Sequence, residues 1–266
     1  MTATADRAPL GELLRDWRTR RRMSQLDLAL EAGVSARHLS FLETGRSRPS
    51  RDKVLRLGEE LEVPLRDRNR LLLAAGFAPA YEERPLEAPE MEPVRRAVAQ
   101  VLTGHEPFPA AVVDRWWNLV AANRNVSVFL DGVAPHLLET PANVLRVSLH
   151  PDGMAPRIVN LAEWRGHLLD RLRREVASTA DGRLGELLAE VEVYPRPPGA
   201  APPRPPHGAI AVPLVLRHGD RELTFFSTVA TFGTAVDVTV AELSIEAFFP
   251  ADGATATFLH DSLPEG

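Results

Sequence analysis

The chain contains no cysteine, no long hydrophobic run and, apart from Lys53, no lysine. The absence of cysteine excludes disulfides, thiolate nucleophiles and cysteine-based zinc or iron–sulfur sites. No apolar stretch approaches the roughly 18–20 residues that a membrane span needs, and Met1–Pro9 lacks the apolar core of a signal peptide. We therefore expect a cytoplasmic protein with no membrane partner.

Sequence motifs of common enzyme classes are missing as well. There is no GxSxG, P-loop or GxGxxG motif. The eight histidines include no pair at i, i+4 and no HExxH, so a helical metal site has no support. His150-Pro151-Asp152-Gly153 could suggest metal or acid–base chemistry, but Pro-Asp-Gly is first a turn signal, and neither Asp114 nor Asp152 has an evident partner. The sequence predicts a protein that is not an enzyme and holds no metal and no resident cofactor.

Charge is unevenly distributed along the 266 residues, which are enough for two domains. Residues 1–77 hold 15 basic and 11 acidic residues, a net charge of +4, whereas the rest holds 16 basic and 25 acidic residues, a net charge of −9. A positive module on an acidic body suits DNA binding by one end. Almost every cation is arginine, which can form two hydrogen bonds to a phosphate or to a guanine edge.

The most specific stretch runs from Ser24 to Gly45. Ser24 and Ser35 are good N-caps for two short helices, and Gly33 between them can adopt a positive φ at a sharp turn. Small and apolar residues recur at the spacing that lets the helices pack closely, at Ala29, Leu39 and Leu42. A plain helical hairpin in a core is the alternative interpretation.

This stretch resembles the phage-repressor-like (Xre) helix-turn-helix domains, and the pattern predicts three flanking helices. The first spans residues 10–22, the fourth spans 50–61 after the cap Ser50, and the fifth runs from Pro64 to Gly76. The expected N-terminal module is therefore a five-helix, lambda-repressor-like bundle over residues 1–78.

The resemblance implies a set of DNA-contacting residues. Arg37 at the start of the third helix is the best candidate for reading guanine, Ala36 and Phe41 could contact thymine methyl groups, and His38 could bond a phosphate or only the helix face. In the resembled family, the position of Gln25 contacts a phosphate and the loop after the third helix faces the DNA backbone. The full predicted set is Arg20, Gln25, Ser35, Ala36, Arg37, His38, Phe41, Arg46 and Arg48. The arginines at the end of the first helix, Arg20 among them, could equally serve as favourable charges at a helix C-terminus.

Residues 79–93 are rich in proline and glutamate, which predicts an extended linker. A helix is expected over 92–102. Together the linker and this connecting helix occupy residues 79–104. The second domain is expected over 105–258, with a tail at 259–266. Its predicted strands are 110–114, 118–122, 210–217, 222–232 and 237–249, and its predicted helices are 123–130, 161–176 and 184–193. Residues 131–160 are expected to be rich in loops. Residues 194–207, with seven prolines, are expected to form a stiff loop, with a polyproline ligand as the alternative.

The order strand, turn, strand, Asn123 and helix resembles the opening of a PAS-type sensor domain. The second domain resembles the ligand-binding domain of MmyB-like transcription regulators, in residues 105–110, 114–123, 143–146, 150–153 and 160–165. The expected fold class is thus α plus α/β, an N-terminal helix-turn-helix domain followed by a PAS-like domain of antiparallel sheet and helices. The resemblance implies a bacterial, chiefly actinobacterial, regulator with an apolar pocket, for a fatty acid or a similar lipid.

Aromatic and apolar residues are available to line such a pocket. The predicted ligand-binding set is Trp116, Trp117, Trp164, Leu168, Phe226 and Phe232. A set of this kind can equally form an ordinary core. We therefore expect a homodimeric, sequence-specific regulator that binds double-stranded operator DNA and senses a small apolar effector. The alternatives are a C-terminal domain that only dimerises or docks a protein partner, and a sensor of flavin or haem.

Overall fold

The computed structural model describes residues 8–179, 181–195 and 212–261. The chain divides into two compact units. One comprises the described residues up to Arg84 together with Thr234–Ala241, and the other comprises Pro85–Gly233 and the chain from Glu242 onward.

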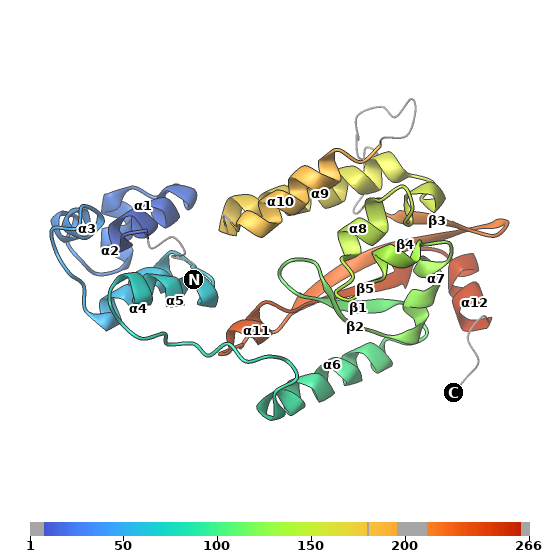
Figure 1. The fold of residues 1–266 in the computed structure, drawn as a ribbon, viewed down its shortest axis with the longest axis horizontal. Coiled ribbons are helices and arrows are strands. Elements are labelled where there is room, and N and C mark those ends of the chain that lie inside the picture. The colour runs from blue at the N-terminus through green and yellow to red at the C-terminus, as the bar shows by residue number, and fades with distance from the viewer. Residues whose placement is uncertain (1–7, 180, 196–211, 262–266) are drawn as a thin grey trace. The chain divides into compact units, whose positions relative to one another are not determined.

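Five short helices form the N-terminal unit (Figure 1): α1 Leu10–Arg20, α2 Gln25–Glu31, α3 Ala36–Glu43, α4 Arg51–Glu60 and α5 Leu65–Ala74. The hydroxyls of Ser24, Ser35 and Ser50 accept hydrogen bonds from the third backbone N–H of the helices that follow them, as N-caps do. Gly33 has φ +64°, so it makes the turn between α2 and α3. The predicted five-helix bundle is confirmed.

Close approach of α1 and α3 depends on Gly11. A Cβ at this position would lie 2.3 Å from the carbonyl oxygen of Glu43, which is far inside van der Waals contact. The shared core buries Leu14, Leu28, Leu39 and Leu57 completely, whereas Leu26 of α2 is 69% exposed. The core therefore holds α3 firmly on α1 and α2.

The segment Thr234–Ala241 belongs to the N-terminal unit although it connects two strands of the other unit. Asp237 forms a parallel bridge with Glu82, and its carboxylate lies 3.2 Å from the guanidinium of Arg84. The short helix α11 Val238–Ala241 follows and contacts α5. A continuous strand over 237–249 is therefore wrong: the Asp237 carboxylate accepts the N–H of Thr239 and starts a helical turn, and the strand begins only at Ser244.

The second unit is built on a five-stranded antiparallel sheet with the order β2-β1-β5-β4-β3. Its strands are β1 Ala110–Val113, β2 Leu119–Ala122, β3 Leu214–His218, β4 Arg221–Thr231 and β5 Ser244–Pro250. The helices of this unit are α6 Glu92–Gly104, α7 Ser127–Leu130, α8 Val144–Leu149, α9 Leu161–Thr179, α10 Gly182–Glu192 and α12 Gly253–Asp261. The predicted fold class, a helical domain followed by an antiparallel sheet with helices, is confirmed.

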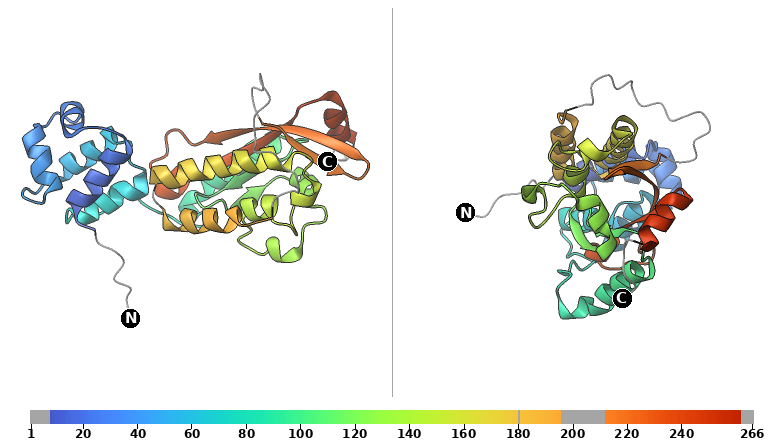
Figure 2. Two further views of the ribbon diagram at one scale, coloured as in Figure 1. Left: turned by 90° about the horizontal axis from the view of Figure 1, so that it is seen from above. Right: turned by 90° about the vertical axis from the view of Figure 1, so that its right-hand side faces the viewer.

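Both faces of the sheet are covered. Ala110 and Val112 of β1 pack with Val98 and Leu102 of α6, whereas Ala111 belongs to the core beneath α8, α9 and α10. This alternation follows from the period of two along a strand. Figures 1 and 2 show α6 on one side of the sheet and the pair α9 and α10 on the other.

Three regions differ from expectation. The loop-rich stretch contains α8, which Asn143 caps through hydrogen bonds from the backbone N–H groups of residues 145 and 146. Helix α12 extends to Asp261 and so includes the first residues of the expected tail, of which Leu259 is buried against the core. The linker is tied down in places, since the Asn69 side chain bonds the backbone of Ala80 and Tyr81, and Met91 is buried. Of the expected proline-rich loop 194–207, residues 196–207 lie outside the described residues.

Candidate functional site

The start of α3 presents an exposed cation. The Ser35 hydroxyl accepts the N–H of His38 at 3.1 Å and sets the first turn of the helix. Arg37 is exposed, and its guanidinium lies 5.3 Å from the centre of the Phe41 ring, one turn further on. This cation–π contact orders the arginine without covering it. Arg37 is thus held near the N-terminus of α3 with its guanidinium exposed.

A polar network behind this surface joins the first three helices. Arg18 of α1 donates to both carboxylate oxygens of Glu43, at 2.6 and 3.0 Å, and the Gln25 side-chain amide donates to the same carboxylate at 2.8 Å. Burial alone would raise the pKa of the Glu43 carboxyl, but the hydrogen bonds from Arg18 and Gln25 hold that pKa below its usual value. The network fixes the orientation of α3 and aims the Gln25 amide at Glu43. No local sequence pattern indicates this contact, because Arg18 and Glu43 are 25 residues apart.

The remaining predicted DNA contacts occupy varied environments. Arg46 and Arg48 are exposed in the loop after α3, and Arg20 is exposed with its guanidinium 5.6 Å from the centre of the Trp17 ring. The Nε2 atom of His38 lies 3.2 Å from the ammonium of Lys53, a nearby cation that the sequence analysis did not select. Ala36 is only partly exposed, because it packs against the core of the bundle.

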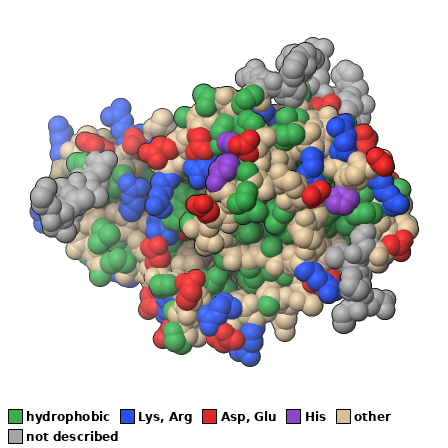
Figure 3. Space-filling model, turned by 45° about the vertical axis from the view of Figure 1, so that its right-hand side comes forward, with side chains coloured by type: hydrophobic (Ala, Val, Ile, Leu, Met, Phe, Trp, Pro, Cys, Tyr) green, Lys and Arg blue, Asp and Glu red, His purple; other side chains and the backbone are tan. Residues whose placement is uncertain are grey.

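Surface charge as a whole does not mark a DNA-binding face. The net charge of the chain is −5, and Figure 3 shows basic and acidic side chains interspersed over the face drawn there. Any attraction for phosphate must therefore come from the local arrangement of cations in the N-terminal unit, whose first 77 residues carry a net charge of +4.

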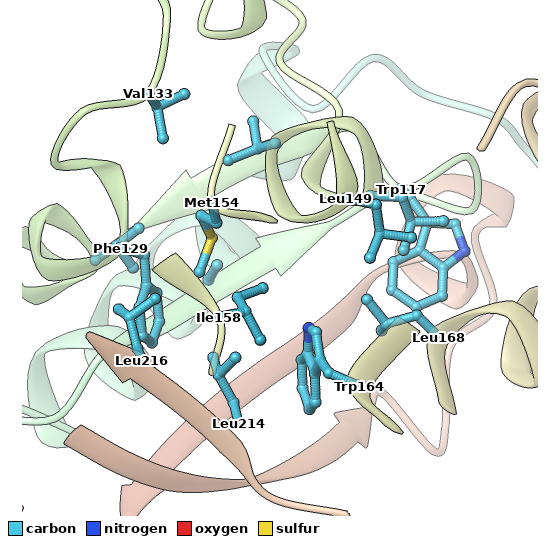
Figure 4. Packing of buried hydrophobic residues seen from close by; sticks show 14 of the residues in the cluster. Trp117, Phe129, Val133, Leu149, Met154, Ile158, Trp164, Leu168, Leu214 and Leu216 are labelled. Carbon is cyan, nitrogen blue, oxygen red and sulfur yellow. The ribbon is translucent and has the colours of Figure 1, made fainter. Parts of the chain in front are cut away.

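The second unit contains an apolar cavity of about 240 Å³ between the sheet and helices α7, α8 and α9. Three predicted residues line it, namely Trp117, Trp164 and Leu168, together with Phe129, Leu145, Met154 and Phe248. Figure 4 shows Trp117, Leu149 and Leu168 gathered at one end of this region and Phe129 and Leu216 at the other, with Trp164 between them. An engineered apolar cavity of about 150 Å³ binds benzene, so this space can admit a small apolar molecule.

The structure places two predicted phenylalanines outside the cavity. Phe226 is 39% exposed and stacks on Phe249, with 5.1 Å between the ring centres. Phe232 packs with the cluster beneath α6, on the other face of the sheet. Strand alternation is the reason, since Phe248, the neighbour of Phe249, points into the cavity instead.

Trp116 is also outside the cavity. Two guanidinium groups lie near its ring, that of Arg115 at 5.5 Å and that of Arg183 at 4.7 Å, and its indole N–H donates to Asp181 at 3.2 Å. The β1–β2 turn separates it from Trp117, because Trp117 has φ +65°, a left-handed conformation that costs a non-glycine residue about 1–2 kcal/mol. The two adjacent tryptophans therefore have different surroundings.

Asp114 organises this turn. Its carboxylate accepts the backbone N–H groups of Trp116 and Asn118, at 2.8 and 2.9 Å, and the Asn118 side-chain amide at 3.0 Å. An ionised carboxylate has about four acceptor sites, and these three hydrogen bonds use most of them. Asp114 therefore has a structural role. The absence of an evident partner in the sequence is explained, because its partners are chiefly backbone groups.

One end of the cavity is polar. Arg171 donates to Glu246 at 2.6 Å and to Glu175 at 3.1 Å, and its guanidinium lies 4.2 Å from the centre of the Trp117 ring. The Trp117 indole N–H donates to Glu175 at 2.7 Å. Burial raises the pKa of the Glu246 carboxyl, and the charge of Arg171 only partly opposes this. The cavity wall thus carries one arginine that faces two carboxylates.

His167 adds a neutral polar group to the same wall. Burial, followed by the charge of Arg171, lowers the pKa of this imidazole below its usual value. At neutral pH it offers one N–H and one lone pair without a charge. Ser148, another lining residue, accepts the indole N–H of Trp164 at 3.0 Å and so positions that ring.

The Arg18–Glu43 pair should make the stability of the N-terminal unit depend on pH. Because the pKa of Glu43 is lower in the folded state, its ionised form stabilises the fold above the unfolded value of 4.5, and this contribution is lost as the pH falls through the folded pKa. Glu43→Gln should lower the free energy of unfolding at neutral pH by about 1–3 kcal/mol and flatten its decline in acid. Thermal unfolding followed by circular dichroism across a pH series measures both effects. Glu12→Gln on α1 is the control, and a parental pH slope in Glu43→Gln would contradict the assignment.

Comparisons with known proteins address both units. Residues 94–261 match the family model described as the MmyB-like transcription regulator ligand binding domain, and residues 14–67 match a helix-turn-helix model. A Bacillus subtilis (strain 168) protein described as an uncharacterized HTH-type transcriptional regulator, RghRB, is 30% identical over 128 residues, which are 47% of this chain and 90% of that protein. Within the described residues, no helix is both long and apolar enough to cross a membrane. The chain belongs to the helix-turn-helix transcription regulators that carry an MmyB-like ligand-binding domain.

Proposed function

We propose that the protein is a homodimeric, sequence-specific DNA-binding regulator that acts in the cytoplasm and whose second domain binds a small apolar effector in the cavity beneath α8 and α9. The observation that carries this proposal is that one chain has both an exposed arginine on the capped helix α3 and an apolar cavity with one polar end. Two such helices in a dimer would meet half-sites about one helical turn, roughly 34 Å, apart or a multiple of it.

The exposed residues divide into base and backbone contacts. Arg37 would read guanine, with Ala36 and Phe41 beside thymine methyl groups. Arg20, Ser35, His38, Arg46 and Arg48 would contact phosphates. Gln25 would join them through its second amide hydrogen, because the first is donated to Glu43.

Arg37 and Arg48 should respond differently to substitution. Arg37→Ala should weaken binding to the operator by about 1–3 kcal/mol and relax one base position, whereas Arg48→Ala should weaken binding to all sequences and reduce the salt slope by about one. Operator selection from a random DNA pool, followed by fluorescence anisotropy at several salt concentrations, separates the two effects. Arg96→Ala on α6 is a control for the loss of one surface arginine. Binding of operator and random DNA by Arg37→Ala at parental strength would remove Arg37 from the base readers.

The polar end of the cavity constrains the effector. Arg171 can pair with an anionic or hydrogen-bond-accepting group, but it already faces Glu175 and Glu246. A fatty acid, one candidate, would bring a third carboxylate. Arg171 would be free for such a ligand only if Glu246 took up a proton, and burial raises the pKa of the Glu246 carboxyl in that direction. The apolar wall would hold the alkyl part.

Filling the cavity should abolish effector binding without unfolding the protein. Leu168→Trp adds a larger side chain at a lining position and should weaken binding at least about tenfold, whereas Phe226→Leu, on the outer face of the sheet, should leave it unchanged. Native mass spectrometry with solvent extraction, followed by thermal shifts with medium-chain and long-chain fatty acids, supplies the binding data, and circular dichroism checks the fold. If the parent carries nothing and no compound shifts its unfolding, the second domain serves dimerisation or docking, and the DNA-binding proposal stands.

The connection between β4 and β5 offers a route from effector to DNA. Both strands contribute cavity residues, Ser227 from β4 and Glu246 and Phe248 from β5. The loop between them, Thr234–Ala241, belongs to the N-terminal unit, where Asp237 pairs with Arg84 and the Thr239 hydroxyl donates to the Arg84 carbonyl at 2.7 Å. An effector that changes the position of these strands would act on the helix bundle through this loop, provided that it binds one arrangement of the chain better than another.

Removing the ion pair that holds this loop should uncouple effector binding from DNA binding. Arg84→Ala removes the ion pair with Asp237 but keeps the backbone carbonyl that accepts the Thr239 hydroxyl. The variant should bind effector and DNA separately like the parent, while the effector-induced change in DNA affinity, typically about 1–3 kcal/mol, shrinks. Anisotropy titrations with and without effector measure the change. Arg95→Ala, which removes a pair with Glu92 elsewhere, should keep the parental coupling, and full coupling in Arg84→Ala would exclude this route.

A further inference from the structure

Two histidines and an aspartate that the proposed function does not use lie together at the surface of the second unit. His136 belongs to the short 3-10 helix Pro135–Leu137, His150 directly follows α8, and Asp152 lies two residues further on. One potential ligand atom from each lies within 4.8 Å of the others. We propose that these three side chains form a binding site for a divalent transition-metal ion of the Zn²⁺ class.

Backbone contacts hold the two segments next to each other. The N–H of Ala134 donates to the carbonyl of Asp152 at 2.9 Å, and the N–H of Gly153 donates to the carbonyl of His150 at 2.9 Å. Gly153 is required at this turn, because a Cβ there would lie 2.2 Å from the carbonyl oxygen of Val147. The ligand-bearing segments are therefore positioned by the backbone rather than by the exposed side chains themselves.

The hydrogen bonding of His150 shows which of its ring nitrogens is unprotonated. The backbone N–H of Asp152 donates to Nδ1 at 3.0 Å, so Nδ1 carries the lone pair and Nε2 the proton. The same Nδ1 lies 3.8 Å from Oδ2 of Asp152. A cation bound by both side chains would replace this N–H···N contact, with Nδ1 as the nitrogen ligand. The Tyr194 ring, 5.0 Å away between ring centres, supports the imidazole edge-to-face.

The ligand set favours a particular class of ion. Zinc binds histidine nitrogens at about 2.0–2.1 Å and carboxylate oxygens at about 2.0–2.2 Å, which places tetrahedral ligands about 3.4 Å apart. His136 and Asp152 are exposed, so their side chains can rotate to close the remaining distance without changing the core. Two imidazoles discriminate against Mg²⁺ and Ca²⁺, which prefer oxygen ligands. Three protein ligands would leave a coordination position for water.

A bound ion would join two segments of the cavity wall. Leu138, two residues after His136, lines the cavity, as does Ser148, two residues before His150. An ion held by both histidines would restrain these wall segments relative to each other. This consequence rests on the proposed effector cavity, whereas the metal site itself does not.

Titration of the full, tag-free chain with Zn²⁺ and Co²⁺ tests the site. Calorimetry should give one Zn²⁺ per chain, and Co²⁺ should gain visible absorption that Zn²⁺ displaces. His136→Gln and Asp152→Asn each remove one ligand and should weaken binding by at least the roughly 10–100-fold that losing an outer-shell partner costs. His260→Gln removes an exposed histidine of α12 and should bind like the parent.

The outcomes separate cleanly. Absence of Co²⁺ absorption above that of the free ion in the parent would overturn the proposal, and so would equal binding by the parent, His136→Gln and Asp152→Asn. Both substitutions replace exposed side chains, and circular dichroism verifies that each variant is folded. Because the readout is binding of the metal ion alone, failure to find an apolar effector leaves this test unaffected.

Discussion

The second unit depends on one constraint, the complete burial of β1. All four of its residues are buried, so each face of the central sheet requires a cover. Helix α6 supplies one cover through Val98 and Leu102, and α8 and α9 supply the other. The second cover leaves about 240 Å³ unfilled above the sheet. The cavity lies here because the two faces of β1 are covered differently. Helix α6 packs closely on one face, whereas α8 and α9 leave space over the other.

In the N-terminal unit, the corresponding constraint is electrostatic. The Glu43 carboxylate is almost fully buried and receives hydrogen bonds from Arg18 and Gln25, so its charge is compensated by groups from two other helices. A buried charge without such partners would be strongly unfavourable. The network therefore couples the position of the recognition helix to the two helices that support it. Arg37 and its neighbours can then project from a rigid surface.

Local signals in the sequence predicted what depends on local chemistry. Serine caps and the positive φ of Gly33 act within a few residues, and they predicted α2, α3 and α4. Trp164 and Leu168 share one face of α9 because they are four residues apart, and both reach the cavity. The sequence could not show that Trp117 lines the cavity and Trp116 does not, because the directions of their side chains depend on a left-handed turn organised by Asp114.

Long-range pairings escaped the sequence analysis. Val238–Ala241 has a β-branched composition that favours a strand, yet docking beside α5 and the Asp237 cap make it helical. His136 and His150 come together only because the backbone around Ala134 and Asp152 is hydrogen-bonded across the intervening residues. The positions of Phe226 and Phe232 could not be predicted without the strand register, because successive residues of a strand lie on opposite faces of the sheet.

The N-terminal unit is not continuous along the chain. Its first segment ends at Arg84, but Thr234–Ala241 returns to it from the middle of the second domain. No single cut can therefore separate the two units intact, and a helix bundle transplanted alone onto another protein would lose the partner of Arg84. A transfer of the bundle to another protein would preserve its full set of contacts only if residues up to 84 and Thr234–Ala241 were moved together.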